Sequence, residues 1–213
     1  MCSIPLVVIY PLMKRYTYWP QFVLGLTFNW GVWVGWAAVH GAVDVSLLAP
    51  LYAAGVCWTL VYDTIYAHQD VADDVLIGVK STALNFGAQS TQWLSGFATS
   101  TVSLLAATGY AAGLGPIYGT VAVAGGALHL VWQLSTVRFS DRASCNAKFI
   151  SNVRFGWLVL LGIVLDRLCA EGRSRDQEQK QDETKQQEKE EDAKQQSAVT
   201  AVGNVAASAA KLQ

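Results

Sequence analysis

The sequence predicts an all-α fold, a multi-pass transmembrane helical bundle followed by a polar tail. The chain of 213 residues is 52% hydrophobic and contains 8 tryptophans, and its composition changes abruptly at about Ala170. Before that point, several stretches of about twenty residues carry no charge, which is long enough for a helix to cross a bilayer. We therefore expect a membrane domain over residues 1–170 and a separate tail over residues 171–213.

The uncharged stretches define five candidate spans. They are roughly Gln21–Val39, Leu47–Ala67, Trp93–Leu114, Ile117–Thr136 and Phe149–Arg167. Met1–Met13 is also apolar but too short to span the hydrocarbon by itself. It has no basic residues before its apolar run, as a signal peptide would. We interpret it as the end of a helix that starts upstream.

The tail has a different composition from the rest of the chain. Residues 171–196 read EGRSRDQEQKQDETKQQEKEEDAKQQ, almost without apolar side chains. Such a segment buries too little apolar surface to offset the entropy lost on ordering, and it lacks the apolar seam of a coiled coil. We expect the tail to be disordered and assign it no function.

The basic residues before Ala170 predict how the spans are oriented. If the spans alternate in direction, the loops at residues 14–20, 68–92 and 137–148 emerge on one face. Nearly all of the eight basic residues lie in or beside these loops: Lys14, Arg15, Lys80, Arg138, Arg142, Lys148 and Arg154, with Arg167 apart from them. This asymmetry places the charged face toward the cytosol or an equivalent matrix.

The stretch YDTIYAHQDVADDVLIGVKSTAL, residues 62–84, gathers four acidic residues at the end of a predicted span: Asp63, Asp70, Asp73 and Asp74. On a continuous helix Asp63, Asp70 and Asp74 would share a face. Carboxylates at a membrane helix end need a cation, and Mg²⁺ prefers such oxygen ligands. Lys80 is placed to contact a phosphate. A solvated acidic loop that only caps two helices remains the alternative.

The same stretch resembles the second Asp-rich motif of the UbiA superfamily of membrane prenyltransferases. It has the form YDTxYAxxDxxDDxxIGxKSTA, typical of the family's 4-hydroxybenzoate polyprenyltransferases. YPLMKRYTYWPQFVLGLTFNWG is similar to the turn between the fourth and fifth helices of these enzymes, and KFISNVRFGWLVLLGIVL resembles the start of their last helix. The resemblance covers about Ile4–Leu168 and implies that this chain supplies about the last five and a half helices of a bundle around a central cavity.

The resemblance implies roles for the acidic residues. In the family, two Asp-rich motifs hold Mg²⁺ against the diphosphate of a polyprenyl donor. Asp70 and Asp74, with Asp73, would be the metal ligands here, and Asp63 and Asp70 the catalytic carboxylates. The residues that surround the diphosphate and the reacting carbon would include Tyr66 and Lys80. The first motif, of the type NDxxDxxxD, is absent from this sequence, and the family carries it on an earlier helix.

Two further residues are expected to meet a substrate. Arg15 matches a family arginine that receives the carboxylate of the aromatic acid, and a guanidinium suits a carboxylate because it can bind it in bidentate fashion. Lys14 and Arg15 also fit ordinary positive-inside residues. Asn29 is a polar group within an apolar run, so we expect it either to hydrogen-bond across helices or to line the cavity, and we favour the cavity.

The function implied by the resemblance is transfer of a polyprenyl group from polyprenyl diphosphate to 4-hydroxybenzoate, ortho to the hydroxyl, in ubiquinone biosynthesis. It implies Mg²⁺, the lipid bilayer and other ubiquinone-synthesis proteins as partners, without nucleic acid. The expected location is the mitochondrial inner membrane or, alternatively, a bacterial plasma membrane. Competing readings are a prenyltransferase for another aromatic acceptor, a non-catalytic truncated fragment, and a transporter, which would be expected to show an inverted repeat of broken helices.

Overall fold

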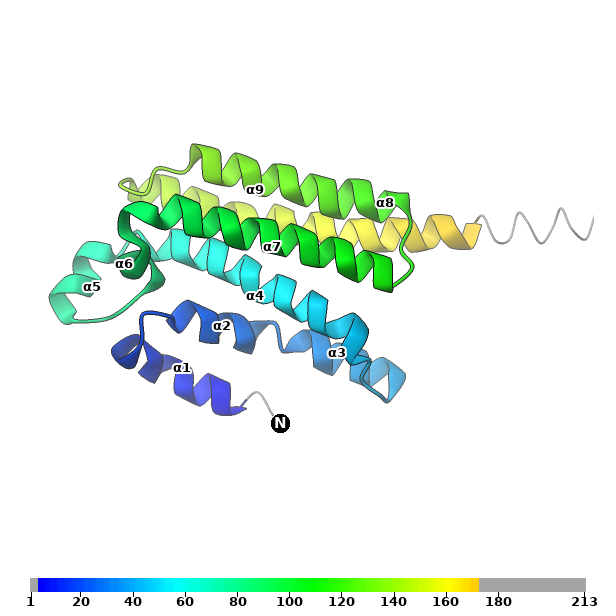
Figure 1. Ribbon diagram of the computed structural model, residues 1–213, viewed down its shortest axis with the longest axis horizontal. Helices are drawn as coiled ribbons and strands as arrows, with labels where there is room; N and C mark the ends of the chain where they lie inside the picture. The colour runs from blue at the N-terminus through cyan, green and yellow to red at the C-terminus, as the bar shows by residue number, and fades with distance from the viewer. Residues whose placement is uncertain (1–3, 173–213) are drawn as a thin grey trace, which may run out of the picture. The chain divides into compact units, whose positions relative to one another are not determined.

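The computed structural model describes residues 4–172, and the regular elements in this range are helices (Figure 1). In chain order they are α1 (Ile4–Tyr16), α2 (Pro20–Phe28), α3 (Gly31–His40), α4 (Val45–Ala67), α5 (Val71–Ile77), α6 (Thr82–Phe86), the 3-10 turn η1 (Gly87–Gln89), α7 (Ser90–Ala111), α8 (Pro116–Tyr118), the π-helical turn η2 (Gly119–Ala124) and α9 (Gly125–Thr136). A last described helix occupies residues 142–172. Of the described residues, 4–167 belong to one compact unit. The predicted tail falls almost wholly outside the described residues.

Local sequence sets the ends of the central helix and of the short helix that follows it. The Asp44 carboxylate caps α4 by accepting hydrogen bonds from the backbone N–H groups of Ser46 (3.0 Å) and Leu47 (3.3 Å). The short helix α5 ends at Gly78, whose φ of +70° is open to glycine and strained for other residues. The chain then turns back toward α2. Helix α4 has already ended at Ala67, so the continuous helix that would place Asp63, Asp70 and Asp74 on one face does not form.

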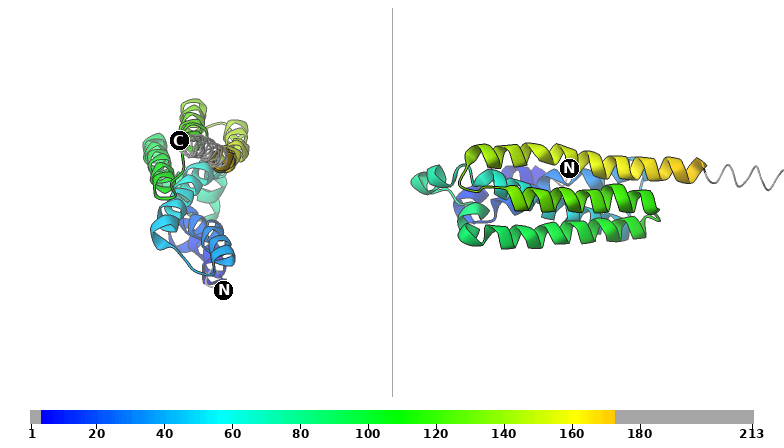
Figure 2. Two further views of the ribbon diagram at one scale, coloured as in Figure 1. Left: turned by 90° about the vertical axis from the view of Figure 1, so that its right-hand side faces the viewer. Right: turned by 90° about the horizontal axis from the view of Figure 1, so that it is seen from above.

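Helix α4 is the centre of the bundle. It packs along α7 on one side and against α2 on another, and α9 packs on α7. The last described helix joins α4 through a stacked pair of rings, Trp58 and Phe155 (4.8 Å), and through the Trp58 indole N–H, which donates to Asn152 Oδ1 at 2.9 Å. In Figures 1 and 2 these four helices run side by side, and α1 to α3 lie on the other side of α4.

The buried core lies among these four helices. Its members are Ala54, Val61, Ile65, Leu94, Ala98, Leu105, Leu130, Cys145 and Phe155. Small residues permit the close approach of the last described helix to η2: a Cβ at Gly162 would lie 2.7 Å from the Cβ of Ala122. Close packing at small residues is a common way for membrane helices to associate.

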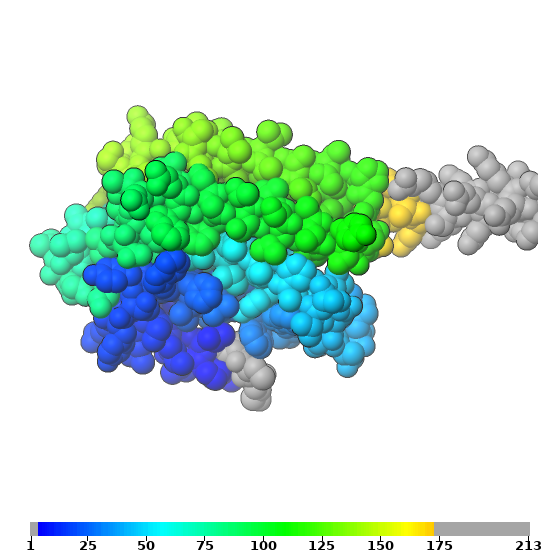
Figure 3. All heavy atoms as spheres, viewed as in Figure 1, coloured from blue at the N-terminus to red at the C-terminus, as the bar shows by residue number. Residues whose placement is uncertain are grey.

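The three charged loops meet at one end of the bundle, as the sequence predicts. The backbone N–H of Lys80 donates to the carbonyl of Lys14 at 2.8 Å, which joins the loop after α5 to the end of α1. Arg142 donates to Asp73 at 2.8 Å, which joins α5 to the start of the last described helix. In the space-filling view α1, α2 and α5 gather at this same end (Figure 3). We call it the loop end.

Three described helical stretches are long and apolar enough to cross a membrane: Pro20–His40, Val45–Ala67 and Pro116–Thr136. They correspond to three of the five predicted spans. A fourth, predicted at Trp93–Leu114, is a helix of 22 residues in the structure, but α7 is not among the three. Helix α7 is rich in hydroxyl side chains, which are less apolar. Ser95 and Thr101, for example, donate to carbonyls one turn earlier in α7.

Candidate functional site

The acidic residues lie where α4 ends and α5 begins, at the loop end. Asp63 is on the last turns of α4 and is partly buried, and Asp70 immediately precedes α5. The backbone N–H of Asp74 donates to the carbonyl of Asp70 at 2.7 Å, so these two residues are one helical turn apart. Asp73 points elsewhere, because its exposed carboxylate pairs with Arg142.

The pKa of Asp74 reports the charge balance of this site. Burial raises it above the usual value, Lys14 opposes that change, and the like charges of Asp70 and Asp73 add to it. A hydrogen bond from Ser81 lowers the pKa of Asp74, as the charge of Lys14 does. The carboxylates are therefore near enough to repel one another, and a cation placed among them would relieve the repulsion.

The segment after α5 is anchored to α2 and α4 by buried hydrogen bonds. The Thr82 backbone N–H donates to Gln21 Oε1 at 3.1 Å, and the hydroxyls of Thr82 and Thr64 are 2.6 Å apart. This anchoring fixes the backbone at Lys80. The Lys80 ammonium donates to the carbonyl of Tyr16 at 3.4 Å, a long hydrogen bond, so the charge stays available at the loop end.

Two residues of α1 lie near the acidic site, although the sequence did not predict them there. The charge of Lys14 acts on both Asp63 and Asp74, and Tyr10 lies within electrostatic reach of Asp63. Tyr10 and Lys14 are four residues apart and therefore share a helix face. No local signal distinguishes Lys14 from an ordinary positive-inside residue, because its effect on Asp63 and Asp74 arises from the packing of the helices.

Tyr66 and Arg15 are both exposed. Tyr66 lies on the last turn of α4, 40% exposed, with its ring centroid 4.8 Å from that of Phe149. Arg15 lies in the last turn of α1, and within residues 4–172 it forms no ion pair. Both side chains are therefore open to a ligand at the loop end.

Asn29 occupies the break between α2 and α3, deeper in the bundle. Its amide donates to the carbonyl of Gly25 at 2.8 Å and to the hydroxyl of Thr59 at 3.0 Å, and Thr59 precedes Asp63 by one turn of α4. Asn29 also lines an apolar cavity of about 310 Å³ together with residues of α4, α7 and the last described helix, among them Trp58, Thr101, Phe155 and Val159. Asn29 thus both hydrogen-bonds to another helix and lines a cavity, and its contact with a substrate stays a prediction.

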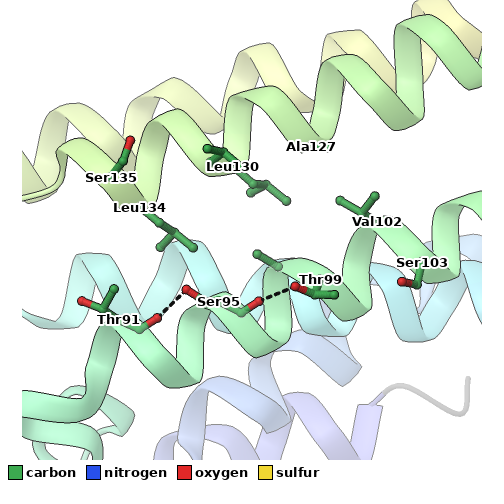
Figure 4. A pocket seen from close by; sticks show the side chains of 11 residues that line it. Thr91, Ser95, Thr99, Val102, Ser103, Ala127, Leu130, Leu134 and Ser135 are labelled. Atoms are coloured by element: carbon green, nitrogen blue, oxygen red, sulfur yellow. Dashed lines mark hydrogen bonds between the residues drawn. The ribbon is translucent and has the colours of Figure 1, made fainter.

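Another hollow, of about 460 Å³, lies between α7 and α9 (Figure 4). Leu130 and Leu134 of α9 face Ser95 and Thr99 of α7 across it. The Ser95 hydroxyl donates to the carbonyl of Thr91 at 2.7 Å, and that of Thr99 to the carbonyl of Ser95 at 2.9 Å. These hydroxyls are satisfied by their own helix, so the hollow offers mainly apolar surface.

The sequence pattern of the UbiA prenyltransferase family matches residues 1–159. The chain belongs to this family. A UbiA homolog from Aeropyrum pernix K1, solved without ligand, has the same fold: the TM-score is 0.64 at 23% identity, over 78% of this chain and 62% of that one.

Several curated relatives of this UbiA-family chain are similar over most of its length. The mitochondrial 4-hydroxybenzoate polyprenyltransferase of Arabidopsis thaliana is 54% identical over 78% of this chain and 40% of its own length. The enzymes of the same name from Dictyostelium discoideum and Homo sapiens are each 50% identical, over 84% and 81% of this chain and 38% and 46% of their own. The chain therefore spans less than half the length of these relatives.

The acidic residues of this UbiA-family chain can be tested for their fit to a divalent cation. In residues 4–172, no three histidine, cysteine or acidic side chains lie close enough together to hold a metal. Asp70 and Asp74, on successive turns, offer two carboxylates, and Mg²⁺ is commonly held by one or two carboxylates with water and substrate phosphate completing its shell. The donor set thus fits Mg²⁺ bound together with a phosphate ligand.

Proposed function

We propose that the protein acts as a 4-hydroxybenzoate polyprenyltransferase of ubiquinone biosynthesis. The observation that carries the proposal is the convergence of Asp63, Asp70 and Asp74 with Lys14 and Lys80 at the loop end. Carboxylates beside ammonium groups suit a Mg²⁺ diphosphate. The identity of about half to relatives with this name supports the choice of acceptor.

We assign the metal to Asp70 and Asp74, with Asp73 as a further ligand. Prenyltransferases of this family generally depend on a divalent metal. Bound Mg²⁺ would supply positive charge for the departing diphosphate. Asp73 can join only by leaving Arg142, and both side chains of that ion pair are more than half exposed. An exposed ion pair contributes about 0–1 kcal/mol, so this exchange requires little free energy.

The remaining side chains at the loop end handle the donor. Lys80 would turn from its long hydrogen bond with Tyr16 to the diphosphate and stabilise charge on the leaving oxygen. Asp63 and Tyr66, both on the last turns of α4, would face the allylic carbon. A carboxylate and an aromatic face both stabilise a carbocation electrostatically.

The acceptor would be held by Arg15, with Asn29 deeper in the cavity. Arg15 would bind the carboxylate of 4-hydroxybenzoate in bidentate fashion. The allylic C–O bond would break with both electrons leaving on the diphosphate, and the ring carbon ortho to the hydroxyl would form a bond to the allylic carbon. That ring carbon would then pass its proton to the released diphosphate, which restores the aromatic ring. The apolar cavity beside Asn29 would exclude water that could otherwise capture the cation.

The proposal extends to the location and partners of the protein. Three apolar helical stretches make the chain an integral membrane protein, and the relatives named above are mitochondrial. We place it in the mitochondrial inner membrane with the loop end toward the matrix, in agreement with the positive-inside rule. Its substrates would be polyprenyl diphosphate and 4-hydroxybenzoate, and its neighbours other proteins of ubiquinone synthesis.

Ligand binding and transfer test the proposal together. The chain is reconstituted in liposomes, and binding of a non-hydrolysable polyprenyl diphosphate analogue is measured with and without Mg²⁺, beside prenylation of 4-hydroxybenzoate. We expect binding to require Mg²⁺ and Asp70→Asn to weaken it by about 100-fold, as for the loss of one essential electrostatic group.

Asp141→Asn is the matched control. Asp141 is another acidic residue at the loop end, paired with Arg138 and outside the site. Binding that is independent of Mg²⁺, or equally weakened by both substitutions, would refute the metal and diphosphate assignment. Mg²⁺-dependent binding with transfer to a different phenol would refute the acceptor alone.

A further inference from the structure

A basic cluster lies between α9 and the last described helix, away from the acidic site. It consists of His129, Lys148 and Arg154. His129 Nε2 is 3.5 Å from the hydroxyl of Ser151, and the Lys148 ammonium lies 3.4 Å from the ring centroid of Trp132. The charges of Lys148 and Arg154 act on His129, and that of Arg154 acts on Lys148. Three basic groups from two helices therefore share one patch.

The cluster has no acidic partner in the described part of the chain. The ion pairs found there join Arg138 to Asp141 and Arg142 to Asp73, and neither includes a member of the cluster. The charges that act on His129 are those of Lys148 and Arg154, and the charge that acts on Lys148 is that of Arg154. Like charges that gather without a counter-charge favour an anionic ligand.

The surroundings of the cluster are those of a lipid-facing surface. Arg154 is exposed, and its neighbours one turn away on the same helix are Ile150 and Trp157, exposed by 58% and 56%. On α9, Trp132 and Leu128 are exposed by 41% and 72%. Lys148 itself is 8% exposed, so Arg154 is the accessible cation of the cluster. A cation ringed by exposed apolar side chains suits an amphiphilic anion better than a soluble one.

The depth of the cluster agrees with a headgroup position. Lys148 lies near the loop end of the last described helix. At a rise of 1.5 Å per residue, Arg154 lies about 9 Å further along this helix. An arginine at that depth in a bilayer is costly unless its side chain extends to an anion near the interface. Trp132, stacked under Lys148, has the side-chain type that is enriched at that level.

We propose that the basic cluster binds the phosphodiester headgroup of an anionic phospholipid in the leaflet at the loop end. Lys148 and Arg154 supply the charge, and His129 and the Trp132 indole N–H are further donors. The acyl chains lie along the exposed apolar side chains beside them. This site is separate from the acidic site and does not depend on the prenyl-transfer proposal.

Lipid retention by the purified chain tests this inference. The full chain is reconstituted with phosphatidylcholine containing a minority of phosphatidylglycerol, extracted in detergent, and analysed for bound lipid by native mass spectrometry. We expect phosphatidylglycerol to be retained in preference to phosphatidylcholine. Arg154→Gln should lower its retention about fivefold, because one basic residue near a membrane surface contributes about 1 kcal/mol. Arg154→Lys should restore most of it.

Arg138→Gln is the matched control, because it removes the same charge at the loop end but outside the cluster. It should leave lipid retention unchanged. Equal losses for Arg138→Gln and Arg154→Gln would show non-specific charge attraction and overturn the site, as would unchanged retention in Arg154→Gln. Displacement of phosphatidylglycerol by millimolar inorganic phosphate would show a soluble-anion site and overturn the assignment to a lipid.

Discussion

Single residues at the loop end act on one another through charge and burial. Lys14 acts on Asp63 and Asp74. His68, at the end of α4, is hydrogen-bonded to Ser90, with its Nε2 2.9 Å from the Ser90 hydroxyl oxygen. The ring centroids of His68 and Phe139 are 4.4 Å apart. Burial lowers the pKa of His68 to about 4, so the imidazole is neutral at physiological pH.

The lowered pKa of His68 predicts a pH dependence of stability. Its usual pKa is about 6.5 and its value in the fold about 4, so the unfolded chain binds the proton more readily between these values. The stability that depends on neutral His68 is present in full above pH 6.5 and is lost as the pH falls toward 4. Thermal unfolding in detergent from pH 7.5 to 4 should show a steeper decline for the wild type than for His68→Gln. Parallel curves would contradict this.

Helix α5 concentrates like charges on one short element. Burial, then Asp70 and Asp73, raise the pKa of Asp74, so its ionised form is disfavoured in the fold. A group whose pKa is raised on folding stabilises the fold at low pH and loses that effect as the pH rises through its folded value. At neutral pH the charge on Asp74 is therefore destabilising, and the proposed cation would offset this effect.

Removing the charge of Asp74 should stabilise the fold in part as bound Mg²⁺ would. We expect Asp74→Asn to unfold at a higher temperature than the wild type in metal-free buffer and to show a smaller increase when Mg²⁺ is added. Differential scanning fluorimetry at neutral pH, with and without Mg²⁺, measures both changes. Asp141→Asn, outside α5, should respond to Mg²⁺ as the wild type does. A full Mg²⁺ response in Asp74→Asn would contradict the role of this carboxylate.

At the opposite end of the bundle, a buried carboxylate holds the turn between α7 and α8. Asp166 of the last described helix is 2% exposed and accepts hydrogen bonds from the backbone N–H groups of Gly115 (2.7 Å) and Tyr118 (3.3 Å). It thus caps α8 from another helix. Nothing in the local sequence indicates this pairing, since the partners are separated by about fifty residues.

Asp166→Ala should destabilise the bundle by about 1–2 kcal/mol, the usual effect of removing a helix cap. For a chain of this size the unfolding temperature should fall by about 2–8 °C. Asp166→Asn retains an acceptor oxygen and should lose less. Thermal unfolding of the wild type and the two variants in the same detergent ranks their stabilities. An alanine variant as stable as the wild type would show that the cap is unimportant.

At the scale of the whole molecule, the bundle separates a charged end from a weakly charged one. The loop end joins α1, α5 and the start of the last described helix, and the loop before Asp44 lies at the other end of α4. Alternating apolar segments and basic loops predicted this separation. Which loops touch could not be predicted, because contacts such as Arg142 to Asp73 join residues far apart in sequence.

Thiol labelling tests the arrangement in a membrane. Asn85→Cys and Ser140→Cys should react with a membrane-impermeant maleimide from one side of sealed vesicles, and Ala42→Cys from the other. All three positions are exposed. The unsubstituted chain, with its four native cysteines, provides the background. Labelling of all three from the same side would contradict the predicted topology.

The sequence by itself determined the helical membrane class, and it predicted the common end of the charged loops and the acidic residues of the motif at residues 62–84, because hydropathy, charge and that motif are local properties. The tertiary structure alone decided that Lys14 faces those carboxylates, that Asp73 pairs with Arg142, and that Asp166 caps α8. These pairings depend on how helices pack against one another, and packing brings together side chains whose separation along the chain carries no local signal.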